Sequence, residues 1–134
     1  MEGTPDAGAE VVVRASDGKF IGHGLFNPHS NIRVRLYSWD EETRPDTNLW
    51  DSLIGDAVAM RDSFATHDSC KARRLIFSEA DGLSGLTADQ YGDWLLVQLT
   101  SLALADRRET LFDQLEKHVA PRGVVLRTEK GIRE

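Results

Sequence analysis

The stretch that decides the fold runs from Glu10 to Ser38 and reads EVVVRASDGKFIGHGLFNPHSNIRVRLYS. Asp17-Gly18 lies between two apolar runs, and its glycine supplies the positive φ that a tight hairpin turn needs. Asn27-Pro28 marks a second turn, because proline ends a strand by removing a backbone donor. The segments between these turns are rich in β-branched and aromatic residues. We therefore predict an antiparallel meander of three strands at 10–15, 20–26 and 31–38.

The third of these strands alternates between two kinds of side chain. Ile32 and its apolar companions at 34 and 36 share one face, whereas Arg33, Arg35 and Tyr37 share the other. A guanidinium group matches phosphate oxygens and an aromatic ring can stack on a base, so this second face is a candidate nucleic-acid contact. The alternative interpretation is the solvated outer face of an amphipathic strand.

Beyond the meander, the hydrophobic period changes twice. Residues 49–64 repeat apolar side chains at three- and four-residue steps, which predicts a helix capped by Asp46 or Thr47. Both faces of 94–100 carry apolar residues, which predicts a central strand covered on both sides. Further elements are expected at 73–77, 86–90, 105–119 (helical) and 124–127. The order βββ-α-βββ-α-β is α+β, with a β domain over 1–45 and a mixed α/β domain over 46–134.

Composition narrows the function classes. The chain has 134 residues with 16 basic and 22 acidic side chains, a net charge of −6. Phosphate binding draws on cationic charge, so any RNA contact must use a local basic stripe or a cationic surface elsewhere in a longer protein. A single cysteine, no secretory signal and no long apolar run indicate a cytoplasmic protein with no membrane partner.

Other chemistry-bearing residues favour structural roles. His67 and Cys70 have the spacing of half a zinc site, but no second close pair accompanies them, so we predict no metal centre. Cys70 also lacks a base motif and is predicted to be a thiol in a connecting loop. Four carboxylates surround a glycine-rich loop and are predicted to set turns through backbone amides: Glu79, Asp81, Asp89 and Asp93. Gly92 is expected to take a positive φ between Tyr91 and Asp93.

The segment RLIFSEADGLSGLTADQYGD at 74–93, followed by WLLVQLTS, resembles a signature of the S-adenosylmethionine-dependent methyltransferases that modify cytosine at carbon 5 in large-subunit ribosomal RNA. That signature reads approximately RL-x-x-GE-[AS]-DGLPGL-x-x-DRYG. The segment at 10–38 is similar to the later strands of the family's PUA domain, and VVLRTEKGIRE is similar to the passage toward its methyltransferase domain. The chain differs from the family pattern at Ser78, Ser84, Gln90, Asp51 and Ser52.

The resemblance implies an incomplete PUA-like β domain over 1–45, followed by a central α/β domain over 46–134. It implies that the opening PUA segment, the catalytic cysteine and the S-adenosylmethionine site of the full-length family lie outside this sequence. We therefore expect no catalytic residue and no cofactor contact in this chain, and we interpret it as a truncated piece of a longer enzyme. Ribosomal RNA is the implied partner. The candidate RNA contacts are Lys19, His23, Arg33 and Arg35.

The first hypothesis is an accessory N-terminal region of such an rRNA methyltransferase, which positions RNA and packs against the catalytic domain. The alternative is a free-standing interaction module that forms a homodimer through open sheet edges, because unpaired strands invite partners. A third possibility, a small enzyme using Glu79, Asp81 and Asp89, is disfavoured because these carboxylates look like turn formers.

Overall fold

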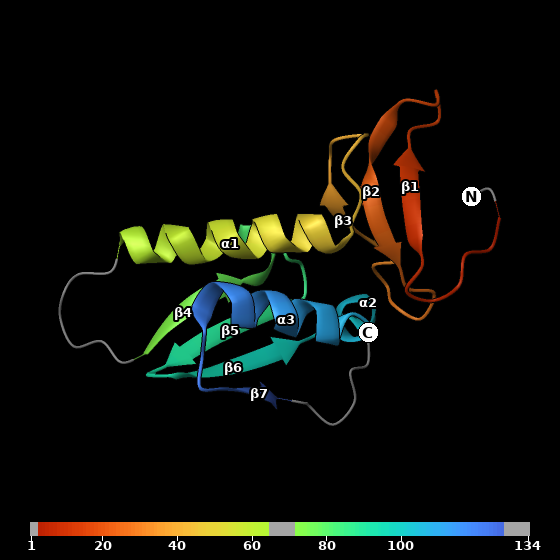
Figure 1. The fold of residues 1–134 in the computed structure, drawn as a ribbon. Coiled ribbons are helices and arrows are strands. Elements are labelled where there is room, and N and C mark those ends of the chain that lie inside the picture. The colour runs from red at the N-terminus through yellow and green to blue at the C-terminus, as the bar shows by residue number, and fades with distance from the viewer. Residues whose placement is uncertain (1–2, 65–71, 128–134) are drawn as a thin grey trace.

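The computed structural model describes residues 3–64 and 72–127, and they form two sheets and a helical layer (Figure 1). The first sheet contains β1 (Glu10–Arg14), β2 (Phe20–Phe26) and β3 (Val34–Ser38). The second contains β4 (Ala72–Phe77), β5 (Leu86–Tyr91), β6 (Trp94–Leu99) and β7 (Gly123–Arg127). The helices are α1 (Thr47–Ser63), the 3-10 turn η1 (Ser78–Asp81), α2 (Leu102–Ala105) and α3 (Arg108–Val119). The α+β prediction is confirmed.

The predicted meander is present, with strand order β1-β2-β3 and antiparallel pairing throughout. Gly18 takes a φ of +85° in the hairpin turn, as expected for this position. Gly22 and Gly24 let β3 approach β2 closely, since a Cβ on Gly24 would lie 2.6 Å from the carbonyl oxygen of Arg35.

In the second sheet, β4, β5 and β6 pair antiparallel in sequence order, and β7 returns parallel to β6. A parallel return needs a long crossover, which α2 and α3 supply. The helix expected at 105–119 begins three residues later, as α3 at Arg108, and the separate short helix α2 precedes it. Arg107 has non-helical backbone angles at this break, and its guanidinium donates to the carbonyls of Ala103 and Gly8.

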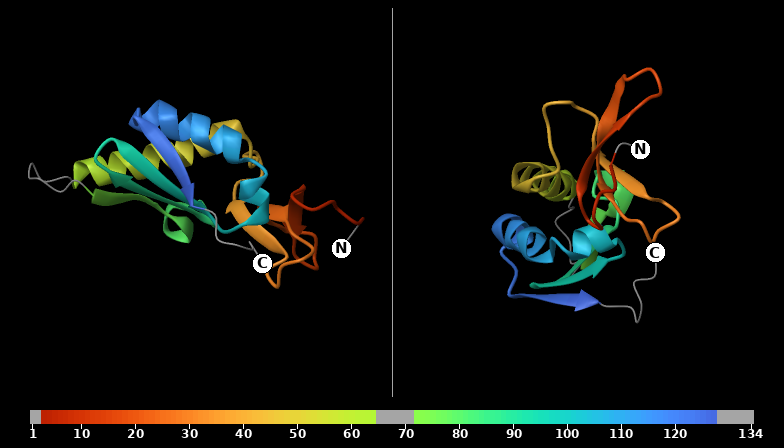
Figure 2. Two further views of the ribbon diagram at one scale, coloured as in Figure 1. Left: turned by 90° about the horizontal axis from the view of Figure 1, so that it is seen from below. Right: turned by 90° about the vertical axis from the view of Figure 1, so that its right-hand side faces the viewer.

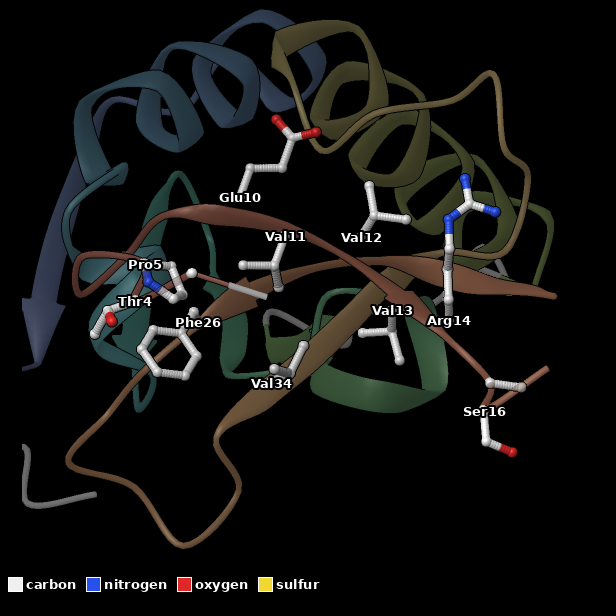
Figure 3. A pocket seen from close by; sticks show the side chains of 12 residues that line it. Thr4, Pro5, Glu10, Val11, Val12, Val13, Arg14, Ser16, Phe26 and Val34 are labelled. Carbon is white, nitrogen blue, oxygen red and sulfur yellow. The ribbon is translucent and has the colours of Figure 1, made fainter. Parts of the chain in front are cut away.

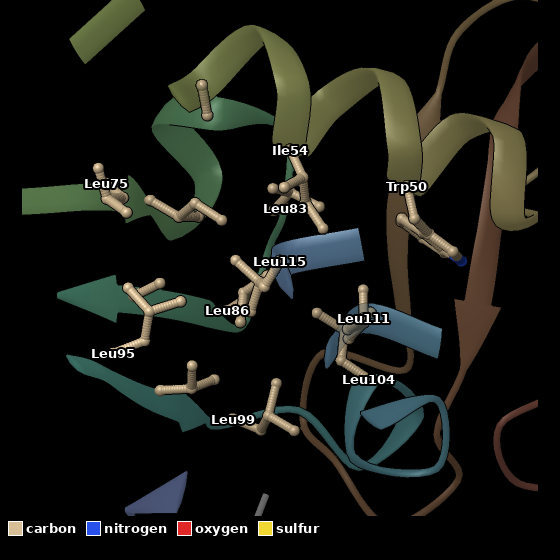
Figure 4. Packing of buried hydrophobic residues seen from close by; sticks show 14 of the residues in the cluster. Trp50, Ile54, Leu75, Leu83, Leu86, Leu95, Leu99, Leu104, Leu111 and Leu115 are labelled. Atoms are coloured by element: carbon tan, nitrogen blue, oxygen red, sulfur yellow. The ribbon is translucent and has the colours of Figure 1, made fainter. Parts of the chain in front are cut away.

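Helices α1 and α3 lie on one face of the four-stranded sheet (Figures 1 and 2). Leu95 and Val97 of β6 are fully buried in the same cluster as Ile54 of α1 and Leu115 of α3. Figure 4 shows Leu95 pointing into this layer. The prediction that both faces of β6 are covered is wrong for the described residues. On the opposite face Trp94 remains 48% exposed, because both long helices pack on the same side.

The meander joins the same core through the face that carries Tyr37. Tyr37 is 2% exposed, its ring meets Trp50 edge-on at 5.1 Å, and its hydroxyl donates to the Ser84 carbonyl at 2.7 Å. Leu25 belongs to the same buried cluster. The expected outer face of β3 is thus its inner face, which corrects the interpretation of Tyr37 as a base-stacking residue. Alternation identifies two faces but does not say which one is covered.

Asp46 caps α1 as predicted, accepting from the amides of Asn48 and Leu49. Gly92 takes the expected positive φ of 57° in the β5–β6 turn. His67 and Cys70, the candidates for half a zinc site and for a loop thiol, lie outside the described residues.

Candidate nucleic-acid interface

The four predicted RNA contacts lie on or beside the meander, but they do not form one surface. Lys19 is exposed in the β1–β2 turn, and Arg33 is exposed just before β3. Because β3 pairs antiparallel with β2, these two cations lie at opposite ends of a seven-residue strand, a separation of roughly 20 Å. A single phosphate group cannot bridge them.

His23 lies on the covered face of β2 and is 6% exposed. Its Nε2 lies 2.9 Å from the Glu41 carbonyl oxygen, and its Nδ1 lies 3.8 Å from the Glu10 carboxylate. Glu10 in turn accepts two hydrogen bonds from the Arg44 guanidinium, at 2.7 and 3.1 Å. The imidazole therefore holds the segment after β3 against the meander.

Arg35 also points inward, toward the loop that follows η1. Its Nη1 donates to Ser84 Oγ at 3.0 Å and lies 3.4 Å from Glu79 Oε1. Ser84 Oγ donates to the same Glu79 carboxylate at 2.7 Å. The pKa of Glu79 is lowered by hydrogen bonds from Ser78 and Ser84 and by the nearby Arg35 charge. This cluster joins the two sheets, and RNA contact by any of the four predicted residues stays a prediction.

An open groove of about 1080 Å³ lies on the other face of the meander (Figure 3). The apolar side chains of Val11, Val13, Phe26 and Val34 line it, with Pro5 at one end. Glu10 and Arg14 stand at its edge. The groove offers apolar contact area, and its lining holds no pair of side chains suited to acid–base or nucleophilic chemistry.

Among the loop carboxylates, Asp81 confirms the turn-forming interpretation through a backbone amide, whereas Asp89 lies within β5 and pairs with an arginine instead. Asp81 is nearly buried, accepts from the Phe77 amide at 2.6 Å and forms a two-point ion pair with Arg61 at 2.6 and 2.7 Å. Asp89 forms a two-point pair with Arg74 across β4 and β5. These carboxylates are held by arginines and by backbone, which leaves them poorly placed for proton transfer.

Three departures from the resembled family pattern also have structural explanations within this chain. Ser78 takes a φ of +46° where that signature has glycine, and its Oγ accepts from the Gly85 amide at 2.8 Å. Gln90 accepts from Arg73 at 2.8 Å, and Asp51 accepts from Lys117 at 2.7 Å. Each replacement side chain therefore takes part in intramolecular contacts.

A group of exposed aromatic side chains lies on the uncovered face of the second sheet and was not predicted from the sequence. Phe77, Tyr91 and Trp94 are 54%, 53% and 48% exposed. The signal was present in the alternation of 94–99, in which Trp94 falls on the opposite face from the buried Leu95. The exposure of Trp94 was not predicted because the strand carries apolar residues on both faces, and both faces were therefore expected to be buried.

Within residues 3–64 and 72–127, no three histidine, cysteine or acidic side chains cluster in a way that could hold a metal ion. None of the helices in these ranges is long and apolar enough to cross a membrane.

The comparison with known proteins agrees with these features. Residues 1–39 match the PUA-like domain family. A ribosomal RNA large subunit methyltransferase I from Shewanella denitrificans is 38% identical over 113 residues, which cover 84% of this chain and 28% of that protein. The namesake from Vibrio cholerae is 34% identical over 140 residues and matches this whole chain. The family resemblance is confirmed.

The match covers only part of the length of each relative. The chain spans about a third of the length of these methyltransferases, 28% and 35% in the two cases. A putative SAM-dependent methyltransferase from Streptococcus mutans has the same fold over 93% of this chain and 34% of its own, with a TM-score of 0.79 and 17% identity. The PUA-like segment and the α/β layer therefore recur together in a larger protein.

Proposed function

We propose that this chain is an accessory region of an S-adenosylmethionine-dependent rRNA (cytosine-5) methyltransferase, in which it positions ribosomal RNA and packs against the catalytic domain. The observation that carries this is the colinear match of the entire chain to about a third of the Vibrio cholerae rRNA methyltransferase. The PUA-like match over residues 1–39 supports RNA as the partner. The proposed place of action is the cytoplasm, where such RNA is assembled into ribosomes.

We propose that the described residues position RNA and that methyl transfer is carried out elsewhere in the full-length enzyme. No strand in residues 3–64 or 72–127 runs into a helix through a glycine-rich loop of the kind that cradles a nucleoside cofactor, so we assign no S-adenosylmethionine contact to them. The carboxylates of the central loop pair with arginines. The division into a β domain over 1–45 and an α/β domain over 46–134 is part of this proposal.

The test uses the Vibrio cholerae relative, with and without the segment that aligns to this chain. We expect the deletion to weaken binding to large-subunit rRNA fragments at low salt and to reduce methyl transfer, while binding of S-adenosylmethionine is retained. Retained cofactor binding is the control that the catalytic domain still folds. RNA binding and methyl transfer that survive the deletion unchanged would contradict the proposed role.

A further inference from the structure

The uncovered face of the four-stranded sheet carries three rows of side chains. Strand pairing places Tyr91 beside Trp94 in the first row and Arg74 beside Asp89 in the second. Phe77 and Thr87 are paired in the third row. The side chains of β6 and β7 extend these rows: Leu96, Gln98, Val125 and Arg127. Both long helices pack on the opposite face (Figure 2).

Tyr91 and Trp94 form an aromatic pair at one end of this face. They are direct cross-strand partners beside the β5–β6 turn, and each is about half exposed. Gly123 lies next to Trp94 on β7, and a Cβ there would lie 2.5 Å from the indole ring. The glycine therefore lets the indole lie over the β7 backbone, which holds the ring in place while leaving about half of it exposed.

Phe77 supplies a third exposed ring at the other end of β4. The Arg74 guanidinium lies over it, 5.1 Å from the ring centre, and is fixed from the side by its two hydrogen bonds to Asp89. An arginine held between an aromatic ring and a carboxylate is ordered before any ligand arrives. Such an arginine loses little side-chain entropy on binding a phosphate or stacking on a base.

The mixture of groups favours a single-stranded nucleic acid over a protein layer as the occupant. An apolar helix packed on this face would desolvate the Arg74–Asp89 pair and the polar row of Thr87 and Gln98, which is costly. A nucleic-acid strand can stack bases on the rings and leave these polar groups in water or in contact with its own polar edges. Sheets backed by helices on one face and bearing exposed aromatic residues on the other are an established platform for stacking RNA bases.

Charge is consistent with this choice. The charged residues of the three rows are Arg74, Arg127 and Asp89, two positive and one negative, for a local charge of +1. The whole chain carries −6. These rows thus carry no excess of negative charge although the molecule is acidic, and we expect stacking to be the main source of affinity, with a shallow dependence on salt.

We propose that the open face of the β4–β7 sheet is a stacking surface for single-stranded RNA, with Tyr91 and Trp94 as the principal base contacts and Phe77 with Arg74 as a second contact. This inference rests on the proposed function for the choice of RNA as the ligand. It shifts the expected RNA surface from the meander, where His23 and Arg35 point inward, to the second sheet.

The experiment titrates the intact chain into fluorescently labelled single-stranded RNA of about ten nucleotides at low salt, a length within the range that OB-fold single-strand binders engage. Trp94→Ala and Tyr91→Ala should each weaken binding by about fivefold to a hundredfold, the range found for loss of one stacked base. Trp94→Phe keeps an aromatic face and should restore most of the affinity.

Two exposed aromatic residues away from this face provide matched controls. Trp39 is 65% exposed just after β3, and Phe64 is 77% exposed at the end of α1. Trp39→Ala and Phe64→Ala should leave the affinity within about twofold of the unmodified chain, as surface substitutions outside a binding site do. Thermal melting of every variant identifies any loss of affinity that is due to unfolding, and Tyr91→Ala serves as the decisive variant if Trp94→Ala fails to fold.

RNA binding that is unaffected by Trp94→Ala and Tyr91→Ala would overturn this inference and leave the RNA-positioning role intact. Failure of the intact chain to bind any of the oligonucleotides would also overturn it, whereas the role in methylation is decided separately with the Vibrio cholerae relative. If sedimentation shows that the same variants lose self-association while their RNA binding is unchanged, the face binds a second copy of the chain. That result would contradict the proposal.

Discussion

Replacing Tyr37 by phenylalanine tests how firmly the meander is joined to the rest of the molecule. The hydroxyl donates to the Ser84 carbonyl at 2.7 Å in a buried position, so Tyr37→Phe removes the donor and leaves a buried acceptor. The expected loss is about 1–2 kcal/mol in the free energy of unfolding. Tyr37→Ala also removes the ring that packs edge-on against Trp50 and should cost about 3–5 kcal/mol.

The assay is urea unfolding followed by fluorescence and circular dichroism, with thermal melting as a second readout. For 134 residues, each kcal/mol corresponds to a shift in Tm of roughly 4 °C. Tyr91, the other tyrosine, is 53% exposed and provides the matched control, since Tyr91→Phe should change stability by less than about 0.5 kcal/mol. Equal stability of the two phenylalanine variants would refute the argument that the buried hydroxyl links the two sheets.

Three further predictions concern stability. Gly92→Val should destabilise by about 1–3 kcal/mol in thermal melts, through backbone strain alone, because φ is +57° and nothing lies within 4 Å of a Cβ there; an unchanged Tm would contradict this. Arg61→Ala should cost about 3 kcal/mol in urea unfolding because it leaves the nearly buried Asp81 carboxylate without its ion pair, and a loss no larger than that of an exposed arginine would count against it. A hydrogen bond from Lys117, and a smaller effect of a hydrogen bond from His118, hold the pKa of Asp51 below its ordinary value. These bonds therefore stabilise the folded chain at a pH above the ordinary carboxyl pKa, and this stabilisation is lost as the pH falls through the lowered pKa. The free energy of unfolding, measured against pH, should fall more steeply in acid for the unmodified chain than for Asp51→Asn.

Local sequence signals predicted most of the elements. The Asp-Gly and Asn-Pro turns placed the meander, and Asp46 placed the start of α1, because these residues act on their own neighbouring backbone. The positive φ of Gly92 followed from the same kind of reasoning. The short helix α2 and the later start of α3 were not predicted; at the break between them Arg107 donates to the distant Gly8 carbonyl, a contact that local sequence does not reveal.

The site was less accessible to sequence reasoning because it depends on which face of each sheet is covered. Arg35 and Tyr37 alternate with apolar neighbours as exposed side chains do, yet both point toward the loop at Ser84. Trp94 alternates in the same way with Leu95 and is half exposed. Alternation is identical in the two strands, so only the tertiary packing of α1 and α3 distinguishes the inner face from the outer one.

The most direct test of the account is photo-crosslinking of the chain to single-stranded fragments of large-subunit rRNA, with the attached residues identified by mass spectrometry. We predict crosslinks at Tyr91 and Trp94 on the open sheet face and none on the exposed sides of α1 and α3. Crosslinks confined to the helices would contradict this prediction. The absence of any crosslink, at RNA concentrations that saturate a PUA-containing methyltransferase, would also contradict it.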